Sequence, residues 1–275
     1  MRFIDTHTHI FPDDLAPRSL ATLVNKLPKN IQSEVPTSNG TFDGLVESMK
    51  NSGIDISVVL PVVTNPKHFE TVNKWAKEIN GKDGIISFGG IHPDNENVDE
   101  KLEYIKKLGL KGIKLHPDYQ NTFIDDERYI KIIKKCVEIG LYVVIHAGLD
   151  AGLPEVIHCP PDKTLNMLKA VYGEKTPEKQ LIILAHLGGC DMYDEVFEKL
   201  CKKKVYFDTA FSLDKIDKDL LIKIIRKHGA ENILFATDCP WGSQKKFVEY
   251  FKQLPLNDEE KELISHKNAQ RILGV

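Results

Sequence analysis

The sequence has no uninterrupted apolar run of about 18 residues, which is the length that a membrane-spanning helix requires. Its N-terminus lacks the basic segment followed by an apolar segment that marks a signal peptide. The 5 cysteines are odd in number and scattered, and no two of them form a Cys-x-x-Cys pair. We therefore expect reduced thiols, no membrane partner and a cytoplasmic location.

The sequence also lacks a strong charge bias. The net charge is −3 over 275 residues, and lysines and acidic residues are mixed along the chain. This balance gives no electrostatic reason to expect nucleic acid as a partner. Linker-like and low-complexity segments are missing too, so we expect a single domain that covers residues 1–275.

Eight apolar segments of strand length alternate with longer amphipathic segments. They are rich in Ile, Val and Leu without polar alternation, which is typical of strands buried on both faces of a parallel sheet. The expected strands are Phe3–Thr6, Ser57–Val63, Ile85–Gly89, Gly112–Leu115, Tyr142–Ile145, Leu181–Ala185, Val205–Asp208 and Ile233–Ala236. Eight strand–helix units in about 250 residues predict an α/β fold of the (β/α)8 TIM-barrel type. A doubly wound open sheet is the alternative, but no strand is followed by a Gly-x-Gly-x-x-Gly motif.

Loop and helix boundaries are indicated at several points. Asn65 before Pro66 supplies a cap residue and a proline at the first helical position, and Gly140 follows a helical pattern where a left-handed residue is needed. The segment 11–40 carries four prolines and is too long for an ordinary strand-to-helix loop, so we expect it to fold over the barrel mouth as a partial lid. Residues 268–274 predict a terminal helix on the outside of the barrel.

His7 and His9 come directly after the first predicted strand. Residues two apart in a strand point to the same side, so the pair aims two imidazoles at one place. His146 and Asp238 lie at the ends of two later strands, and the C-terminal ends of all barrel strands share one face. Three imidazoles and a carboxylate form a ligand set suited to Zn²⁺ or a similar divalent ion, with one position left for water.

His186, at the end of the sixth strand, is better placed for proton transfer than for metal ligation. A neutral imidazole near a metal-bound water can orient or deprotonate that water. His68, His228 and His266 fall in predicted helices and His158 in a loop. We expect these four histidines at the surface.

Short motifs at the strand ends occur in a specific order. They are His7-Thr-His9, Gly112-Ile-Lys-Leu-His-Pro117, Val144-Ile-His-Ala-Gly148, His186-Leu-Gly-Gly189, Thr237-Asp-Cys-Pro-Trp241 and the terminal Asn268-Ala-Gln-Arg-Ile-Leu273. Together they resemble the amidohydrolase superfamily and, more closely, the amidohydrolase-related branch that includes aminocarboxymuconate semialdehyde decarboxylase. The resemblance runs from Asp5 to Leu273, which is nearly the whole chain.

This resemblance implies a metal-dependent enzyme with the same site that the strand ends indicate. By it, His7, His9, His146 and Asp238 would be metal ligands. His186 would be the catalytic base or the residue that orients water. Asp238 would also exchange a proton with the metal-bound water.

Lys114 has two functional interpretations. In binuclear members of the superfamily a strand lysine is carboxylated and bridges two metal ions, and with His186 it would complete a second site. Members that resemble this chain more closely hold one metal ion. We therefore favour one ion over two, with Lys114 as a cation for an acidic substrate group. A simple lysine near the mouth is the remaining alternative, although burying it would require a partner.

Three further residues are candidates for contact with substrate. His92 and His116 each precede a proline and are expected to line the pocket, or equally to cap barrel loops by hydrogen bonding. Trp241 closely follows Asp238 and could form a wall of the substrate pocket or a packing contact.

From these residues we predict a metal-dependent hydrolase that uses metal-activated water on a small ester, lactone or amide. The alternative is a non-oxidative, metal-dependent decarboxylase of a small unsaturated or aromatic carboxylic acid, in which water protonates the substrate carbon. A barrel that has lost catalysis and only binds a ligand is a third interpretation, which the complete ligand set disfavours. An exposed helix face could support a homodimer, but no pattern in the sequence identifies one.

Overall fold

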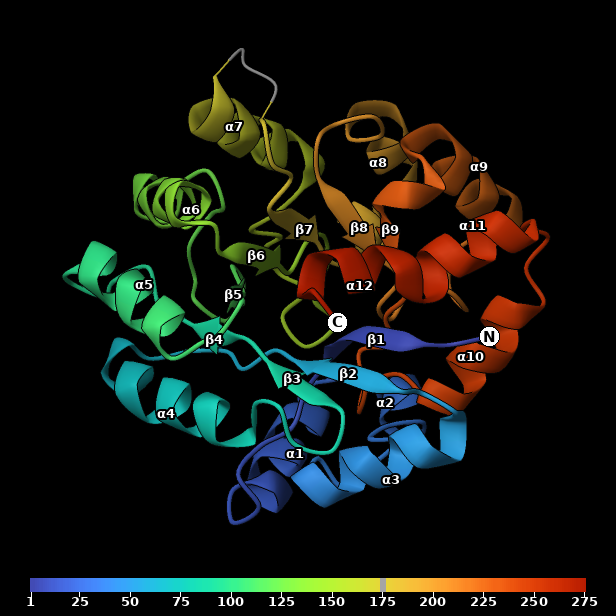
Figure 1. Cartoon of the computed structure of the whole chain (residues 1–275), viewed down its shortest axis with the longest axis horizontal. Coiled ribbons are helices and arrows are strands. Elements are labelled where there is room, and N and C mark those ends of the chain that lie inside the picture. The colour runs from blue at the N-terminus through green and yellow to red at the C-terminus, as the bar shows by residue number, and fades with distance from the viewer. Residues whose placement is uncertain (174–176) are drawn as a thin grey trace.

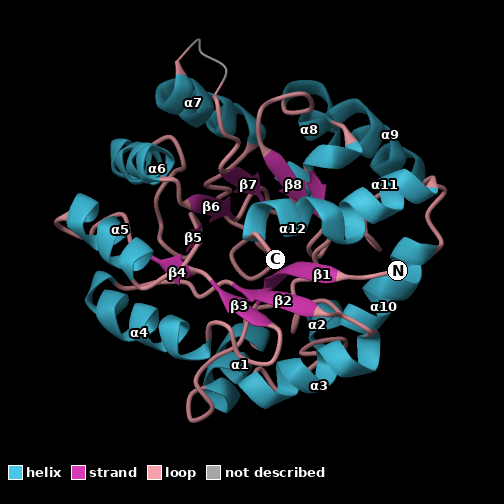
Figure 2. Ribbon diagram, in the orientation of Figure 1, coloured by secondary structure: helices cyan, strands magenta, loops and turns pink. Residues whose placement is uncertain are grey.

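The computed structural model of the chain describes residues 1–173 and 177–275. A ring of parallel strands is enclosed by helices (Figure 1, Figure 2). The strands are β1 (Ile4–Thr8), β2 (Ile56–Val59), β3 (Ile85–Ser87), β4 (Gly89–Gly90), β5 (Gly112–Leu115), β6 (Tyr142–Ile145), β7 (Ile182–Leu184), β8 (Tyr206–Asp208) and β9 (Ile233–Leu234).

The helices alternate with these strands and form the outer layer. They are α1 (Ala16–Val24), α2 (Lys29–Gln32), α3 (Phe42–Ser52), α4 (Phe69–Ile79), α5 (Val98–Lys107), α6 (Glu127–Ile139), α7 (Pro161–Tyr172), α8 (Tyr193–Lys199), α9 (Lys218–His228), α10 (Gln244–Lys252), α11 (Asp258–Glu262) and α12 (Asn268–Leu273). Four short turns complete the set: η1 (Pro66–His68), η2 (His186–Gly188), η3 (Ala230–Asn232) and η4 (Leu263–Lys267). In the part of the chain that the structure describes, no helix is long and apolar enough to cross a membrane.

The strands close into a ring of eight. Strands β1 to β3 form one hydrogen-bonded set and β4 to β9 another, each in sequence order. Only Phe88 separates β3 from β4, and its N–H donates to the Val59 carbonyl oxygen at 2.9 Å, so the two pieces form one barrel strand. The ring closes where Asp238, after β9, donates its N–H to the His7 carbonyl oxygen of β1 at 2.9 Å. The predicted single-domain (β/α)8 TIM barrel is therefore confirmed.

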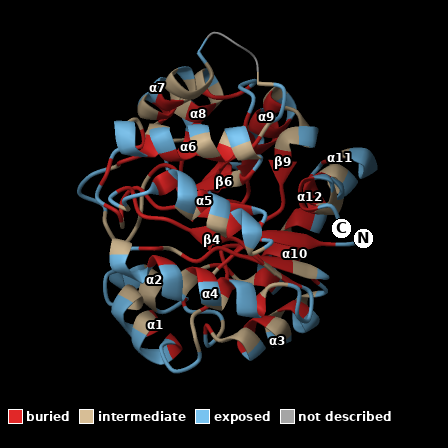
Figure 3. Ribbon diagram, turned by 60° about the vertical axis from the view of Figure 1, so that its left-hand side comes forward, coloured by how far each residue is buried: buried red, intermediate tan, exposed pale blue. Residues whose placement is uncertain are grey.

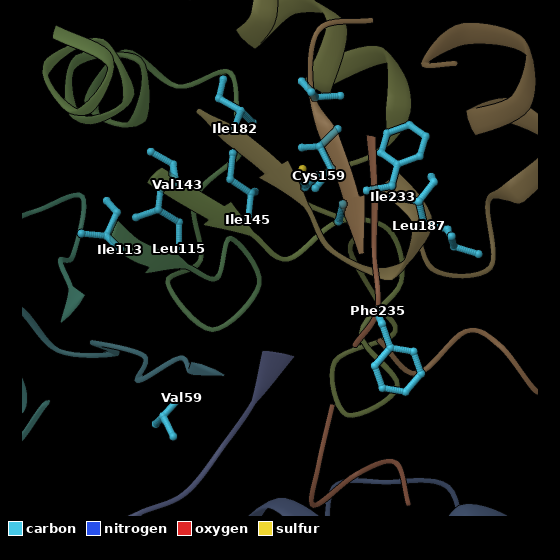
Figure 4. Packing of buried hydrophobic residues seen from close by; sticks show 14 of the residues in the cluster. Val59, Ile113, Leu115, Val143, Ile145, Cys159, Ile182, Leu187, Ile233 and Phe235 are labelled. Atoms are coloured by element: carbon cyan, nitrogen blue, oxygen red, sulfur yellow. The ribbon is translucent and has the colours of Figure 1, made fainter. Parts of the chain in front are cut away.

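Both faces of the strands are buried, which explains their continuous apolar sequences. Figure 4 shows Ile113, Leu115, Val143 and Ile145, which belong to the main hydrophobic core. Val144, between two of them, belongs to a second apolar cluster that fills the barrel interior. Figure 3 shows the consequence: the strands are mostly buried, whereas the helices are buried on one side and exposed on the other.

Helix α12 lies across one end of the barrel, in front of the strands in Figure 1. Its residues Ala269, Ile272 and Leu273 pack with Ile4, at the start of β1, and Val58 of β2. The terminal helix therefore seals the N-terminal end of the strands, whereas the sequence predicted only that it packs on the outside.

The interior at this end is packed closely enough to require glycine at position 112. A Cβ atom on Gly112 would lie 2.5 Å from Cε2 of Phe88 and 2.6 Å from the Tyr142 carbonyl oxygen. The Phe88 ring is itself fully buried, and the cavity beside it is only about 10 Å³, too small for the ring to move into. A larger residue at position 112 would disrupt the filling of the barrel.

The segment 11–40 lies on the opposite face of the barrel and contains α1 and α2. Its ends are joined by a hydrogen bond of 2.8 Å from the Phe11 N–H to the Gly40 carbonyl oxygen. The Thr37 N–H donates to the Pro240 carbonyl oxygen at 2.8 Å, and the Thr37 hydroxyl donates to the Gly242 carbonyl oxygen at 3.2 Å. The segment is thus attached to the loop after β9, beside Asp238.

His228, at the end of α9, is 4% exposed, so the prediction that it lies at the surface is wrong. Its ring stacks on Phe207 with centroids 3.9 Å apart. Its Nε2 lies 2.9 Å from the Val205 carbonyl oxygen, and its Nδ1 accepts a hydrogen bond of 3.1 Å from the Lys202 N–H. The apolar side of α9 carries this ring inward, where backbone groups satisfy both of its nitrogens.

Candidate metal centre

Strand β1 and the loop after β9 bring His7, His9 and Asp238 together. The Nε2 atoms of the two histidines lie 3.1 Å apart. Oδ1 of Asp238 lies 3.5 Å from Nε2 of His7 and 3.3 Å from Nε2 of His9. The structure therefore brings three of the four predicted metal ligands into one cluster.

Groups behind the two imidazoles fix their orientation. Nδ1 of His7 lies 2.8 Å from Oδ2 of Asp208, and Nδ1 of His9 lies 2.9 Å from the Leu60 carbonyl oxygen. Because both oxygens accept, each Nδ1 carries the ring proton and donates it. The lone pair of each Nε2 is left facing Asp238, as in metal-binding histidines whose other nitrogen donates to an oxygen.

Asp238 is held in a costly position. Its φ of 66° lies in the left-handed region, which non-glycine residues rarely adopt. Burial raises the pKa of its carboxyl, but positive charge at the place of His7 and His9 outweighs burial and lowers the pKa to about 2. Its buried Oδ1 has no hydrogen-bond partner, which is unfavourable unless a cation or a proton faces it.

Lys114 of β5 is 0% exposed and extends into the same cluster. Its Nζ lies 2.9 Å from Nε2 of His7. Burial lowers the pKa of Lys114 to about 8, and the carboxylates of Asp208, Asp238 and Asp150 oppose that shift. Nζ of Lys114 thus contacts the nitrogen that His7 would offer a metal ion, and Lys114 places a titratable cation beside the candidate metal ligands.

His186, in the turn after β7, lies between His7 and His146. Its Nδ1 lies 2.9 Å from the Ala210 carbonyl oxygen, and its backbone N–H donates to Oδ1 of Asp208 at 2.9 Å. Its ring centroid is 5.3 Å from that of His7. Because the Ala210 oxygen accepts, Nδ1 of His186 is the protonated nitrogen and Nε2 presents a lone pair to the interior.

His146, the fourth predicted ligand, lies on the far side of His186. Its Nδ1 is 2.9 Å from Nε2 of His186. Among the described residues, its ligand atoms group with those of His116 and Asp150 and not with those of His7, His9 and Asp238. The rings of His116 and His146 are stacked with centroids 4.1 Å apart, and Nε2 of His116 lies 3.4 Å from Oδ2 of Asp150.

Sequence reasoning missed Asp118 and Asp150, and it wrongly placed His158 at the surface. His158 is buried, and both its backbone N–H and its Nδ1 contact Oδ1 of Asp118, at 3.1 and 3.0 Å. The other carboxylate oxygen, Oδ2, lies 3.7 Å from Nε2 of His146. The only sequence signal for Asp118 was its position two residues after His116, in a loop at the end of a strand.

The remaining predicted substrate contacts have local roles in the loops. Nδ1 of His92 accepts a hydrogen bond of 3.1 Å from the Asp94 N–H, and the His92 N–H donates to Oδ1 of Asn95 at 3.0 Å. Trp241 is half-buried, and its backbone N–H donates to the Asp238 carbonyl oxygen at 2.7 Å. The Trp241 bond tightens the turn that holds Asp238.

The cluster of His7, His9 and Asp238 has the chemistry of a divalent-metal site. Imidazole nitrogen and carboxylate oxygen are ligands of zinc and similar ions. The three separations of 3.1–3.5 Å match the spacing of about 3.3 Å between ligands that lie ~2.0–2.1 Å from a tetrahedral ion. The lone pairs of both histidines and the unpaired Oδ1 of Asp238 are directed inward, so these residues fit a metal ion.

No curated protein matches the sequence. Among solved structures, 2,6-dihydroxybenzoate decarboxylase complexed with 2,6-dihydroxybenzoate is similar, with 16% identity, a TM-score of 0.75 and 100% of each chain covered. 5-Carboxyvanillate decarboxylase from Novosphingobium aromaticivorans, complexed with manganese and 4-hydroxy-3-methoxy-5-nitrobenzoic acid, has 16% identity and a TM-score of 0.73, covering 100% of this chain and 96% of that one. A putative amidohydrolase from Staphylococcus aureus has 20% identity and a TM-score of 0.70, with 100% of each chain covered.

These comparisons contradict the prediction of a hydrolase acting on an ester, lactone or amide. Similar structures include 2,6-dihydroxybenzoate decarboxylase and 5-carboxyvanillate decarboxylases, whose named activity is decarboxylation. Several of them were solved with manganese. The sequence motifs could not separate the two reactions because both use one metal ion and one base.

The family is shown by the sequence itself. A family model described as amidohydrolase matches residues 4–275, which include every strand and every candidate ligand. The match agrees with the resemblance of the strand-end motifs and with the barrel that carries them. The chain belongs to the amidohydrolase family, and it is an enzyme of that superfamily.

Proposed function

We propose that this protein is a metal-dependent, non-oxidative decarboxylase of a small aromatic or unsaturated carboxylic acid. The observation that carries the proposal is the buried cluster of His7, His9 and Asp238 with Lys114 beside it. Such a cluster can hold a metal ion and an anionic group next to each other. The fold of the dihydroxybenzoate and carboxyvanillate decarboxylases supports the same class of reaction.

In this proposal His7, His9, His146 and Asp238 would hold one divalent ion, zinc or manganese. When bound, the ion supplies positive charge that holds the substrate oxygens and stabilises negative charge on the substrate. His146 would offer the ion its Nδ1, the atom that faces Nε2 of His186 at 2.9 Å. A single ion leaves Lys114 uncarboxylated, as the cation that pairs with an acidic group of the substrate.

In decarboxylation the bond between the substrate carbon and its carboxylate breaks, carbon dioxide leaves, and the carbon takes up a proton. Asp238 is ionised at neutral pH, since its pKa is about 2, and its Oδ1 faces the site, so in this proposal it relays a proton between water and the substrate carbon. His186 keeps its Nδ1 proton on Ala210 and offers its Nε2 lone pair to the interior, which suits it to orient water. His92, His116 and Trp241 line the substrate pocket in this proposal.

The segment 11–40 acts as a partial lid over the mouth. Thr37 ties it to the carbonyl oxygens of Pro240 and Gly242, next to the loop of Asp238. Nζ of Lys26 lies 5.4 Å from the centroid of the Tyr119 ring, in the loop after β5. These contacts on two sides of the mouth support a cover that excludes water from the reaction.

The cysteines and the net charge support a cellular compartment and a class of partner for this enzyme. All 5 cysteines are free and buried, which supports a reducing compartment, the cytoplasm. The net charge of −3 disfavours nucleic acid as a partner and is compatible with a small-molecule substrate. A homodimer remains a proposal, tested by the molar mass in solution.

The reaction is tested by measuring carbon dioxide release from a panel of hydroxybenzoates and unsaturated acids, with enzyme reconstituted with Mn²⁺ or Zn²⁺. We expect release from at least one acid, abolished when the metal is removed with a chelator and restored when it is added back. The same panel should include esters, lactones and amides. Hydrolysis of one of these without any carbon dioxide release would reject the proposal.

A further inference from the structure

Two buried polar atoms face each other beside the candidate metal centre without a hydrogen-bond partner. They are Oδ2 of Asp118 and Nε2 of His146, which lie 3.7 Å apart. Buried polar atoms in proteins are nearly always paired, and a carboxylate oxygen is especially costly to leave unpaired. The facing pair therefore indicates an interaction that completes when the site adopts its working geometry.

Asp118 is fixed in place by its other oxygen. Oδ1 accepts the backbone N–H of His158 at 3.1 Å and contacts Nδ1 of His158 at 3.0 Å. The side chain of Asp118 is 0% exposed. Oδ2 is thus held rigidly in front of His146 and remains free to accept one more proton donor.

The tautomer of His146 depends on whether its ring proton is donated to His186 or to Asp118. Nδ1 of His146 faces Nε2 of His186, whose own proton is on Nδ1 and is directed to Ala210. If the proton of His146 were on Nδ1, it would be donated to His186, and no lone pair would be left there for a metal. If the proton is on Nε2, it is directed to Asp118, and the lone pair of Nδ1 faces that of His186 Nε2 at 2.9 Å. Two facing lone pairs repel each other unless a cation is bound beside them, so this tautomer belongs to the metal-loaded site.

We propose that Asp118 is a positioning residue that accepts the Nε2 proton of His146 and thereby turns the Nδ1 lone pair of His146 toward the metal. The inference rests on the proposed metal centre. Asp150 is a weaker candidate for this role, because its Oδ2 is 4.0 Å from Nε2 of His146 and also faces Nε2 of His116 at 3.4 Å. His158, Asp118 and His146 thus form a chain that leads from a buried loop to the metal site.

The variant Asp118→Asn tests this directly because it keeps the size of the side chain and one oxygen for His158. It replaces the acceptor in front of His146 with an amide group that donates. We expect the affinity for Zn²⁺ or Mn²⁺, measured by competition with a chelator, to fall about 10- to 100-fold. Asp150→Asn should change it less than about threefold, and the exposed Asp99→Asn should leave it unchanged.

A second measurement needs no variant. Nitrogen-15 NMR of the zinc-loaded wild-type protein distinguishes an imidazole protonated on Nε2 from one protonated on Nδ1. We expect the Nε2 form for His146, because its Nδ1 lone pair is then free to bind the ion and its Nε2 proton is directed to Asp118. A His146 protonated on Nδ1 in the zinc-loaded protein would overturn the inference.

The outcomes separate this inference from the proposed function. A wild-type protein that binds no divalent ion rejects the metal centre on which this inference rests. A wild-type protein that binds one ion, with equal affinity in Asp118→Asn, overturns only the role of Asp118. Two ions per chain, with the second lost in both Asp118→Asn and His116→Ala, would also overturn it, because Asp118 would then be a direct ligand.

Discussion

The two ends of the same barrel strands bury opposite kinds of side chain. On β6, Val144 belongs to the apolar cluster sealed by α12, and His146, two residues further along, belongs to the candidate site. On β8, Tyr206 likewise belongs to the apolar cluster, and Asp208, two residues further along, contacts His7 in the candidate site. Because residues two apart in a strand point to the same side, each strand directs apolar side chains inward at one end and polar ones at the other.

The difference shows that the apolar end of the barrel stabilises the fold, whereas the polar end destabilises it. The apolar end encloses a cavity of only about 10 Å³, lined by residues such as Phe88 and Leu273 that need no polar partner. At the polar end Lys114 and Asp208 lie fully buried, and Asp238 and His186 adopt left-handed backbone conformations. Desolvation and strain of this kind are typical of sites kept for function.

Removing a ligand should have the largest effect, and only at the polar end. In His9→Ala we expect metal affinity to fall by more than the roughly 100-fold that loss of an outer partner costs, because Nε2 of His9 faces Asp238 directly. Elemental analysis after dialysis against a weak chelator measures the retained metal. His68→Ala, at an exposed histidine, is the matched control. Full metal content in His9→Ala would remove His9 from the ligand set.

His186→Ala should separate catalysis from metal binding. Its Nε2 lone pair faces the interior of the site, so its loss should lower kcat by about 10²- to 10⁴-fold, the usual range for a positioned acid or base. The metal content at saturating metal should stay close to that of the wild type. Unchanged turnover would refute its role, and loss of metal would make it a ligand.

The sequence predicted the barrel better than it predicted the site. Gly112–Leu115 and Tyr142–Ile145 were expected with the bounds they have, because a strand buried on both faces leaves a continuous apolar run. The third expected strand is interrupted at Phe88, a break that no change in hydrophobicity marks. His7, His9 and Asp238 could be predicted to meet because all three follow strand ends.

The rest of the site depends on loops, whose course the sequence pattern does not reveal. Asp118 and His158 are separated by 40 residues and meet only because the loops after β5 and β6 fold toward each other. Strand position alone also could not tell that Nδ1 of His146 faces His186 and that its Nε2 faces Asp118. Side-chain direction at the end of a strand is set by such neighbours.

Phe88→Ala should damage the apolar end and spare the polar one. The ring is fully buried inside the barrel and packs closely over Gly112. Its removal leaves a cavity, and we expect the free energy of unfolding to fall by about 3–5 kcal/mol, measured by denaturant titration. Metal affinity and kcat below the unfolding range should stay near wild-type values. A loss of metal affinity as large as that in His9→Ala would show that the two ends are not independent.

His228 gives the smallest and most specific test, because it is a titratable group placed away from the site among apolar contacts. Burial lowers its pKa from 6.5 to about 4, and both of its nitrogens are hydrogen-bonded in the neutral form. As pH falls from 6.5 toward 4, the unfolded chain binds a proton that the folded protein rejects, so stability is lost, by up to about 3 kcal/mol. His228→Gln should lack this contribution, so the difference in unfolding free energy between wild type and variant should shrink as pH falls through that window. With His68→Gln as control, parallel pH curves for the wild type and His228→Gln would show that His228 does not titrate as its surroundings require.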